Sequence, residues 1–299
     1  MPVSSNGRLR GPELGCQPAG QLDLGQMPTI PWLSRYQTCR SNCGEVCAPV
    51  TVESITVILA AVVVGSLVKG VTGTGLPTIA IPVMAGFLGV EEAVVIMAIP
   101  TVVTNAWMLW EHRSYADRAR DLPTLLVAGT LGVLAGVWTL SALNERVLNL
   151  TLASLIIAYL LLFVSRPALQ LAPALTRRLS PPVGLAAGAL QGATGISAPI
   201  LATYLHAYRL EQRAYLFSVT ALVQVFALVQ VAGLLLAGLY TRHRVLASLL
   251  ALVPIVLVLP IGIRLSYALD RRRFEWAVLA LLAVMAVKLL VEGLPARAA

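Results

Sequence analysis

Two short segments of this chain share a pattern of glycine, hydroxyl and proline residues that suits binding of a small anion. The first, residues 69–77, reads KGVTGTGLP, and the second, residues 191–199, reads QGATGISAP. Both interrupt apolar runs, and in hydrocarbon such a break persists only when it is buried in protein or lines a wet cavity. Glycines permit the bend, while Pro77 and Pro199 suit the first turn of a new helix. Each break is therefore expected to expose a helix N-terminus, whose free N–H groups and partial positive charge favour an anion.

The residues predicted to bind the substrate come from both segments and from the long helices that follow them. Lys69 supplies one formal positive charge, and Gln191 occupies the matching position. A functional lysine here would pair with an anionic substrate, although the residue would also suit an interfacial position or a cap on the preceding helix. Asn105 and Gln224 either donate to the substrate or join neighbouring helices. The predicted substrate-binding set is Lys69, Gly70, Thr72, Gly73, Thr74, Gly75, Asn105, Gln191, Gly192, Thr194, Gly195, Ser197 and Gln224.

The composition places these segments in a membrane protein. Hydrophobic residues make up 58% of the 299 positions and charged residues only 12%, whereas a soluble domain carries about 25% charged residues. Several runs of roughly 16–24 residues hold almost no charge and are long enough to cross a hydrocarbon core as helices. The sequence therefore predicts an all-α, polytopic membrane helix bundle.

The chain is predicted to consist of a tail and two related membrane halves. Residues 1–50 form a polar tail, expected to be disordered or to reflect a start codon assigned too early. The first membrane repeat covers residues 53–164, a central cytoplasmic loop covers 165–181, and the second repeat covers 182–293. In each repeat two short apolar pieces, a broken or re-entrant pair, precede three full helices. The odd number of crossings inserts the halves in opposite orientations, as in many inverted-repeat secondary transporters.

Arginines in the loops predict how the bundle is oriented in a bacterial inner membrane. When the loops are assigned alternately to the two sides, twelve arginines fall on one side and four on the other. Because basic residues concentrate on the cytoplasmic side, both termini are predicted to lie outside. The larger set is Arg113, Arg118, Arg120, Arg166, Arg177, Arg178, Arg209, Arg213, Arg264, Arg271, Arg272 and Arg273, and the smaller is Arg146, Arg242, Arg244 and Arg297.

The sequence also excludes several classes of function. It has no Asp or Glu deep in a span, no nucleophile or metalloprotease motif and no Walker A sequence, so we expect no enzyme. Its basic residues are not interleaved with aromatic ones, so we expect no nucleic-acid partner. No cofactor or metal is predicted, because Cys16, Cys39, Cys43 and Cys47 in the tail match no common zinc spacing.

The paired segments resemble the two signatures of the TauE/SafE sulfite exporter family, also called TSUP transporters. Residues 65–77 follow the pattern GxxxKGxTGxGxP, and residues 188–199 follow GxxxGxTGxxxP. The resemblance covers about residues 53–293. It implies an inner-membrane carrier of small anions, often sulfite or organosulfonates. Leu76 and Pro77 stand where the family usually continues its glycine cluster, and Ser197 occupies a corresponding small position in the second copy.

The predicted function is therefore secondary transport of a small anion: sulfite, an organosulfonate or a related small organic anion. Both helix breaks are expected to lie back to back near the bilayer midplane and to hold that anion together. The alternatives are a passive anion channel of the same fold and a non-catalytic integral subunit of a membrane complex. The expected partners are the small anionic substrate and the lipid bilayer, with a proton or a sodium ion as the candidate coupling ion.

Overall fold

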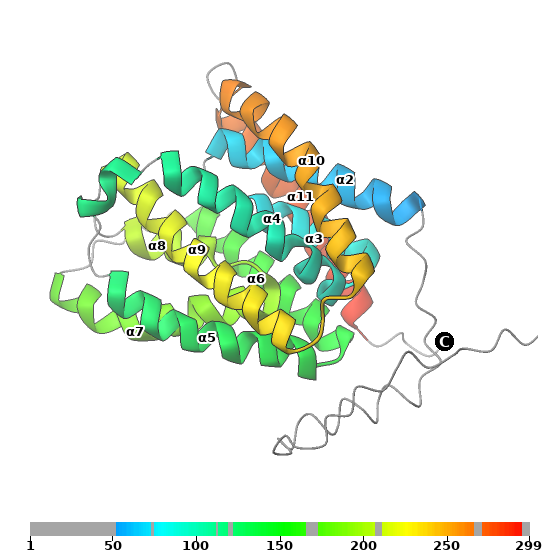
Figure 1. Cartoon of the computed structure of the whole chain (residues 1–299), viewed down its shortest axis with the longest axis horizontal. Helices are drawn as coiled ribbons and strands as arrows, with labels where there is room; N and C mark the ends of the chain where they lie inside the picture. Colours follow the sequence, from blue (N-terminus) through cyan, green and yellow to red (C-terminus); the bar gives the residue numbers. More distant parts are fainter. Residues whose placement is uncertain are drawn as a thin grey trace, which may run out of the picture. The chain divides into compact units, whose positions relative to one another are not determined.

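All the regular elements in the described part of the chain are helices (Figure 1). The computed structural model describes residues 52–72, 75–111, 113–118, 122–165, 173–206, 211–265 and 271–294. The predicted tail and its four cysteines lie outside these residues. The elements are α2 (Val52–Thr72), α3 (Leu76–Leu88), α4 (Val90–Glu111), the 3-10 helix η1 (Arg113–Arg118), α5 (Leu122–Ala142), α6 (Glu145–Ser165), α7 (Pro173–Thr194), α8 (Ala198–His206), α9 (Gln212–Leu236), α10 (Arg242–Leu265) and α11 (Arg271–Gly293).

Seven of the described helices are long and apolar enough to cross a membrane, namely α2, α4, α5, α6, α9, α10 and α11. Their outer surfaces are apolar as well. Trp110, Leu131, Leu236 and Val291, from four different helices, are 60–81% exposed. Exposed apolar side chains on so many helices suit contact with lipid and not with water. The predicted all-α membrane bundle is therefore confirmed.

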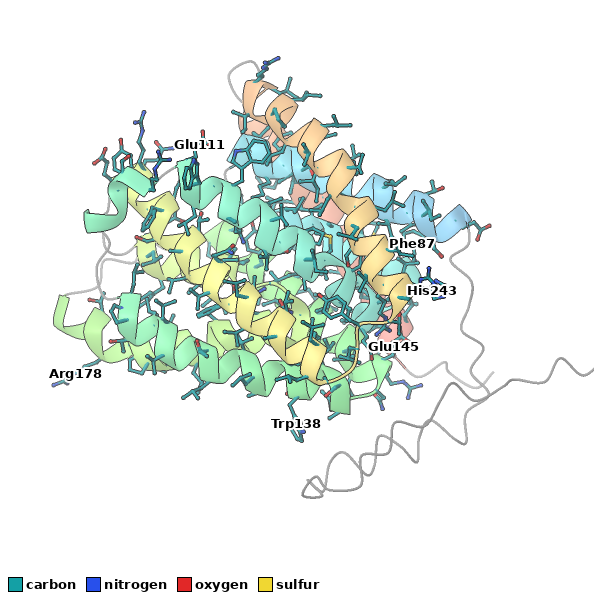
Figure 2. The ribbon with its side chains drawn as sticks, in the orientation of Figure 1. Phe87, Glu111, Trp138, Glu145, Arg178 and His243 are labelled. Carbon is teal, nitrogen blue, oxygen red and sulfur yellow. The ribbon has the colours of Figure 1, made fainter. Side chains whose placement is uncertain are left out.

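The helix ends divide into two groups. Glu111 and Arg178 lie at one end of the helical unit, and Phe87, Glu145 and His243 lie at the other (Figure 2). This is the division that the alternating loop assignment requires. The inverted orientation of the halves and the cytoplasmic position of the Arg178 end stay predictions.

Helices α4 and α9 run antiparallel to each other through the bundle. At one end, Arg213 near the start of α9 donates to the hydroxyl of Tyr115, just past the end of α4, at 2.8 Å. At the other end, Arg244 in the first turn of α10 forms ion pairs of 2.8 Å with Glu91 and 2.6 Å with Glu92, at the start of α4. These contacts fix how the two helices align along their length.

The first helix of each broken pair is longer than the apolar pattern predicted. Helix α2 continues to Thr72 and α7 to Thr194, so Lys69 and Gln191 lie in or near the last helical turn and not in an unwound segment. Helix α7 also begins at Pro173, inside the range assigned to the central loop. Only α3 and α8, with 13 and 9 residues, are short.

The second helix of each pair begins where the sequence predicted. Gly75 is the N-cap of α3 with a φ of 108°, a value that favours glycine, and Pro77 lies in the first turn. Helix α8 begins at Ala198, so Pro199 is likewise in a first turn. A proline there loses no hydrogen bond, because the first N–H groups of a helix have no partner inside it.

The first helix of each predicted half packs against a helix of the other half. Helix α10 lies alongside α2, and α5 alongside α7 (Figure 1). Glycines form both contacts: a Cβ on Gly70 would lie 2.6 Å from Cα of Gly262, and one on Gly192 would lie 2.8 Å from Cα of Gly136. Small residues allow such close approach between membrane helices. The glycines of α5 and α7 therefore serve close helix packing.

Replacing Gly192 with valine should destabilise the protein. A Cβ at this position would lie 2.2 Å from the carbonyl oxygen of Val133 and 2.7 Å from the amide nitrogen of Val137, so the α5 and α7 backbones would have to separate. Overpacking of this kind costs about 1–3 kcal/mol or more. We expect a lower thermal unfolding temperature for purified Gly192→Val. The matched control is Gly86→Ala, whose Cβ would meet only the flexible Lys288 side chain, at 3.3 Å. Equal unfolding temperatures for the two variants would contradict this account.

Candidate functional site

Lys69 is buried and its side chain reaches across to α4. The residue is 3% exposed. Its Nζ donates to Oγ1 of Thr104 at 2.9 Å and to Oδ1 of Asn105 at 2.7 Å. Because both hydrogen bonds go to α4, the side chain neither extends to an interface nor caps the carbonyl end of its own helix. The structure thus brings together two residues, Lys69 and Asn105, that the sequence predicted to bind substrate.

The bonding around Lys69 leaves hydrogen-bond donors without partners. The hydroxyl of Thr104 donates to the carbonyl of Pro100 at 2.9 Å, so its lone pairs face the ammonium group. Asn105 accepts from Lys69 through its oxygen, and its buried Nδ2 has no hydrogen-bond partner. An ammonium group has three N–H donors, and Lys69 uses two of them in the part of the chain that the structure describes. The site therefore offers about three free N–H groups in a buried place.

The positive charge of Lys69 has no carboxylate partner among the described residues. The two carboxylates of α4 nearest its start, Glu91 and Glu92, pair with Arg244 instead. Helix α3 also begins nearby: a Cβ on Gly65, one turn before Lys69 on α2, would lie 2.9 Å from the Leu76 carbonyl. The N-terminus of α3 thus adds partial positive charge on the side of the break. An ammonium group and a helix N-terminus together favour an anion between them.

The polar side chains of the second segment are bonded within the protein. Nε2 of Gln191 donates to Oε1 of Gln230 at 2.9 Å, and Ser197 Oγ donates to Oε1 of Gln191 at 2.7 Å. Nε2 of Gln230 donates in turn to the carbonyl of Gln191 at 2.7 Å. The hydroxyl of Thr194 donates to Leu190 of its own helix at 2.7 Å. In this arrangement these side chains hold the second break together, and their predicted contact with substrate stays a prediction.

The two segments meet α4 at different levels. A Cβ on Gly195 would lie 2.5 Å from Cδ1 of Ile81 and 3.9 Å from Cγ1 of Val94, whereas Lys69 contacts Asn105. The eleven residues from Val94 to Asn105 correspond to a rise of about 16 Å. Each hydrogen bond spans only about 3 Å, so the Gly195 bend and Asn105 lie in different layers of the bundle. One anion site shared by both breaks stays a prediction.

Gln224 is a buried residue of α9 whose amide oxygen is unpaired. It is 9% exposed, and its Oε1 has no hydrogen-bond partner. Gln224 lies at the middle of the 25-residue α9, and Asn105 lies past the middle of the 22-residue α4. Since the helices run antiparallel with matched ends, the two amides lie at levels only about 7 Å apart. Asn105 of α4 and Gln224 of α9, both predicted to bind substrate, therefore each retain an unpaired polar atom.

The remaining predicted residues are glycines that permit the bends of the backbone, or they lie outside the described residues. Gly75 and Gly195 have positive φ values of 108° and 70°, so glycine is favoured at both bends. Gly73 and Thr74 lie outside the described residues, as does the side chain of Thr72. Their predicted contact with substrate stays a prediction.

Sequence reasoning missed Thr104 and Gln230, each of which bonds to a motif residue. Thr104 directly precedes Asn105 on α4, and the side chains of both accept hydrogen bonds from Lys69. Gln230 was a visible signal, because a further glutamine in the apolar part of α9 is costly unless it is bonded. Spacing from the start of the helix selected Gln224, six residues earlier, instead.

Gln224 and Gln230, the two buried glutamines of α9, should respond differently to replacement by leucine. Gln230→Leu removes the acceptor for Gln191 Nε2 and a donor to the Gln191 carbonyl. Hydrogen bonds between membrane helices are worth about 0.6–1.7 kcal/mol each, so this variant should unfold at a lower temperature. Gln224→Leu breaks no hydrogen bond and removes a buried unpaired oxygen, so its unfolding temperature should match or exceed that of the parent protein. The reverse order would show that the bonding pattern is wrong.

Comparison with known proteins gives one match. No curated protein and no solved structure matches the chain. A family model described as "Sulfite exporter TauE/SafE" matches residues 57–289. That range contains both glycine-rich segments, Lys69, Asn105, Gln224 and Gln230. The chain is therefore a member of the TauE/SafE sulfite exporter family of membrane transporters.

Proposed function

We propose that the chain is a secondary carrier of a small anion: sulfite, an organosulfonate or a related small organic anion. Membership of the family supports transport of an anion across a membrane by a multi-pass protein. The observation that carries the proposal is a buried Lys69 ammonium group bonded only to neutral oxygens within the described residues. The anion would bind at Lys69 and the free Nδ2 of Asn105.

The physical reason is the cost of burying a charge. Taking an ammonium group out of water costs several kcal/mol, and neutral hydrogen-bond acceptors repay only part of this cost. An anion that binds Lys69 supplies the missing opposite charge and also accepts from Asn105. The negative end of the α2 dipole favours a positive charge at this position.

The closed second segment favours a carrier over an open channel. Residues 191–197 are all buried, and Gly195 lies directly against Ile81 of α3. The side chains of Gln191 and Ser197 are bonded within the protein, so in this arrangement they close the way past Lys69. In the proposed cycle the second segment opens as the first closes, as two related halves in inverted orientation would allow. The exchange of helix partners between the halves supports that relation.

Replacement of Lys69 tests the proposal most directly. Lys69→Ala, and Lys69→Met, which preserves much of the side-chain volume, should abolish uptake or efflux of the anion by proteoliposomes. Both variants should still fold, because they remove a buried charge without a carboxylate partner. Lys288→Met is the matched control, since Lys288 pairs with Glu292 four residues along α11. Normal anion transport by a folded Lys69→Ala variant would remove this residue from the mechanism.

Counter-flow distinguishes the carrier from the two alternatives. A carrier loaded with unlabelled anion on one side should accelerate entry of labelled anion from the other, whereas a channel should not. The purified chain alone should support this exchange. A need for a second protein would favour the subunit reading, and uptake without acceleration would favour the channel.

A further inference from the structure

The predicted substrate-binding residues with unpaired polar atoms include one acceptor as well as several donors. Lys69 and Asn105 offer N–H donors, which suit the oxygens of an anion. Gln224 offers an unpaired oxygen instead. Turning the amide of Gln224 over exchanges its oxygen and nitrogen, but an oxygen that needs a donor is always present. The described site thus combines several donors with one acceptor.

Gln224 lies on the side of α9 turned away from α5. Phe226 packs on Gly129 of α5, because a Cβ on that glycine would meet the ring at 1.9 Å. Gln224 precedes Phe226 by two residues, so it points about 160° around the helix from it. Gln230, which bonds to Gln191 of α7, points only about 40° from Phe226, so α7 lies on the same side of α9 as α5. The remaining long helix packed on α9 is α4, which carries Asn105. Gln224 therefore points to the α4 side of α9, at a level about 7 Å from that of Asn105.

We infer that the transported anion carries a hydrogen-bond donor of its own, and that Gln224 accepts from it. The inference rests on the proposed function and names its substrate class. Such an anion holds an O–H or N–H group within a few bonds of the acid group: a protonated oxyanion, a hydroxyalkyl- or aminoalkylsulfonate, or the corresponding carboxylate. A single ammonium group at the site matches a single negative charge.

Gln224 then acts as a specificity residue. A buried oxygen that loses its water and finds no donor in the ligand costs more than the hydrogen bond would have contributed. Sites built to hydrogen-bond a substrate hydroxyl accordingly reject analogues that lack it. Asn105 and Lys69 hold the acid group of either ligand, so only the second group of the ligand distinguishes the two.

The test compares two sulfonates that differ in donor capacity. 2-Hydroxyethanesulfonate and 2-chloroethanesulfonate carry the same charge on a similar frame, but only the first can donate. Their affinities for the purified full-length protein in detergent are measured by isothermal titration calorimetry. We expect the hydroxy compound to bind the parent protein about tenfold more tightly. In Gln224→Leu the ratio should fall to about one, mainly because the chloro compound binds better.

Asn149→Leu is the matched control. Asn149 of α6 is another buried amide with an unpaired oxygen, but it lies one turn from Glu145, at the opposite end from Glu111 (Figure 2). This variant should keep the tenfold preference. Equal binding of both sulfonates to the parent protein, or an unchanged ratio in Gln224→Leu, overturns the role of Gln224 and leaves the anion carrier standing. If none of the two sulfonates, sulfite and glycolate binds at all, the proposed anion carrier itself is overturned.

Discussion

Burial of an ammonium group without a carboxylate partner governs how the centre of this protein is arranged. Lys69 lies near the end of α2, where the partial negative charge of the helix terminus favours a cation. Neighbouring α4 supplies two neutral oxygens, one of which is freed for this purpose by the bond from the Thr104 hydroxyl to Pro100. These contacts hold the ammonium in one position but give it no carboxylate partner among the described residues, and this combination is the basis of the proposed anion site.

Close backbone packing makes that burial possible. The C-terminal turn of α2 is pressed against α10 at Gly70 and Gly262, so water and lipid are kept from the lysine. The corresponding contact of α7 with α5 shields the Gln191 group in the same way. The two segments therefore share their packing but differ in chemistry: one holds a charge with unpaired donors, and the other holds amides bonded to each other.

Much of this architecture was predictable because it depends on local pattern. Apolar runs predicted the membrane helices, and Pro77 and Pro199 predicted where α3 and α8 begin. The prediction from local pattern was wrong where tertiary contacts determine where a helix begins. Helix α7 starts at Pro173 in a segment rich in proline and arginine, which suits a first helical turn and an exposed end as well as a loop.

The candidate site was predictable only in part. Lys69 and Asn105 are distinctive as polar residues in apolar runs, and the structure joins them directly. The partner of Gln191 could not be read from the chain, because it depends on the alignment of α9 with α7 across 39 residues. Spacing from the start of α9 selects Gln224, whereas the contact selects Gln230. Helix-to-helix alignment of this kind follows from packing and not from the periodicity of either helix alone.

The partner exchange between α2 and α10, and between α7 and α5, has a mechanical consequence. Two helices whose backbones are in contact through glycine cannot separate without losing that packing. Each such pair is therefore expected to move as one rigid unit. Each unit combines a helix from before the middle of the chain with one from after it. Alternating exposure of the anion would thus arise from tilting of the α2–α10 pair relative to the α5–α7 pair, about the antiparallel helices α4 and α9. It would not arise from motion of one half of the polypeptide against the other.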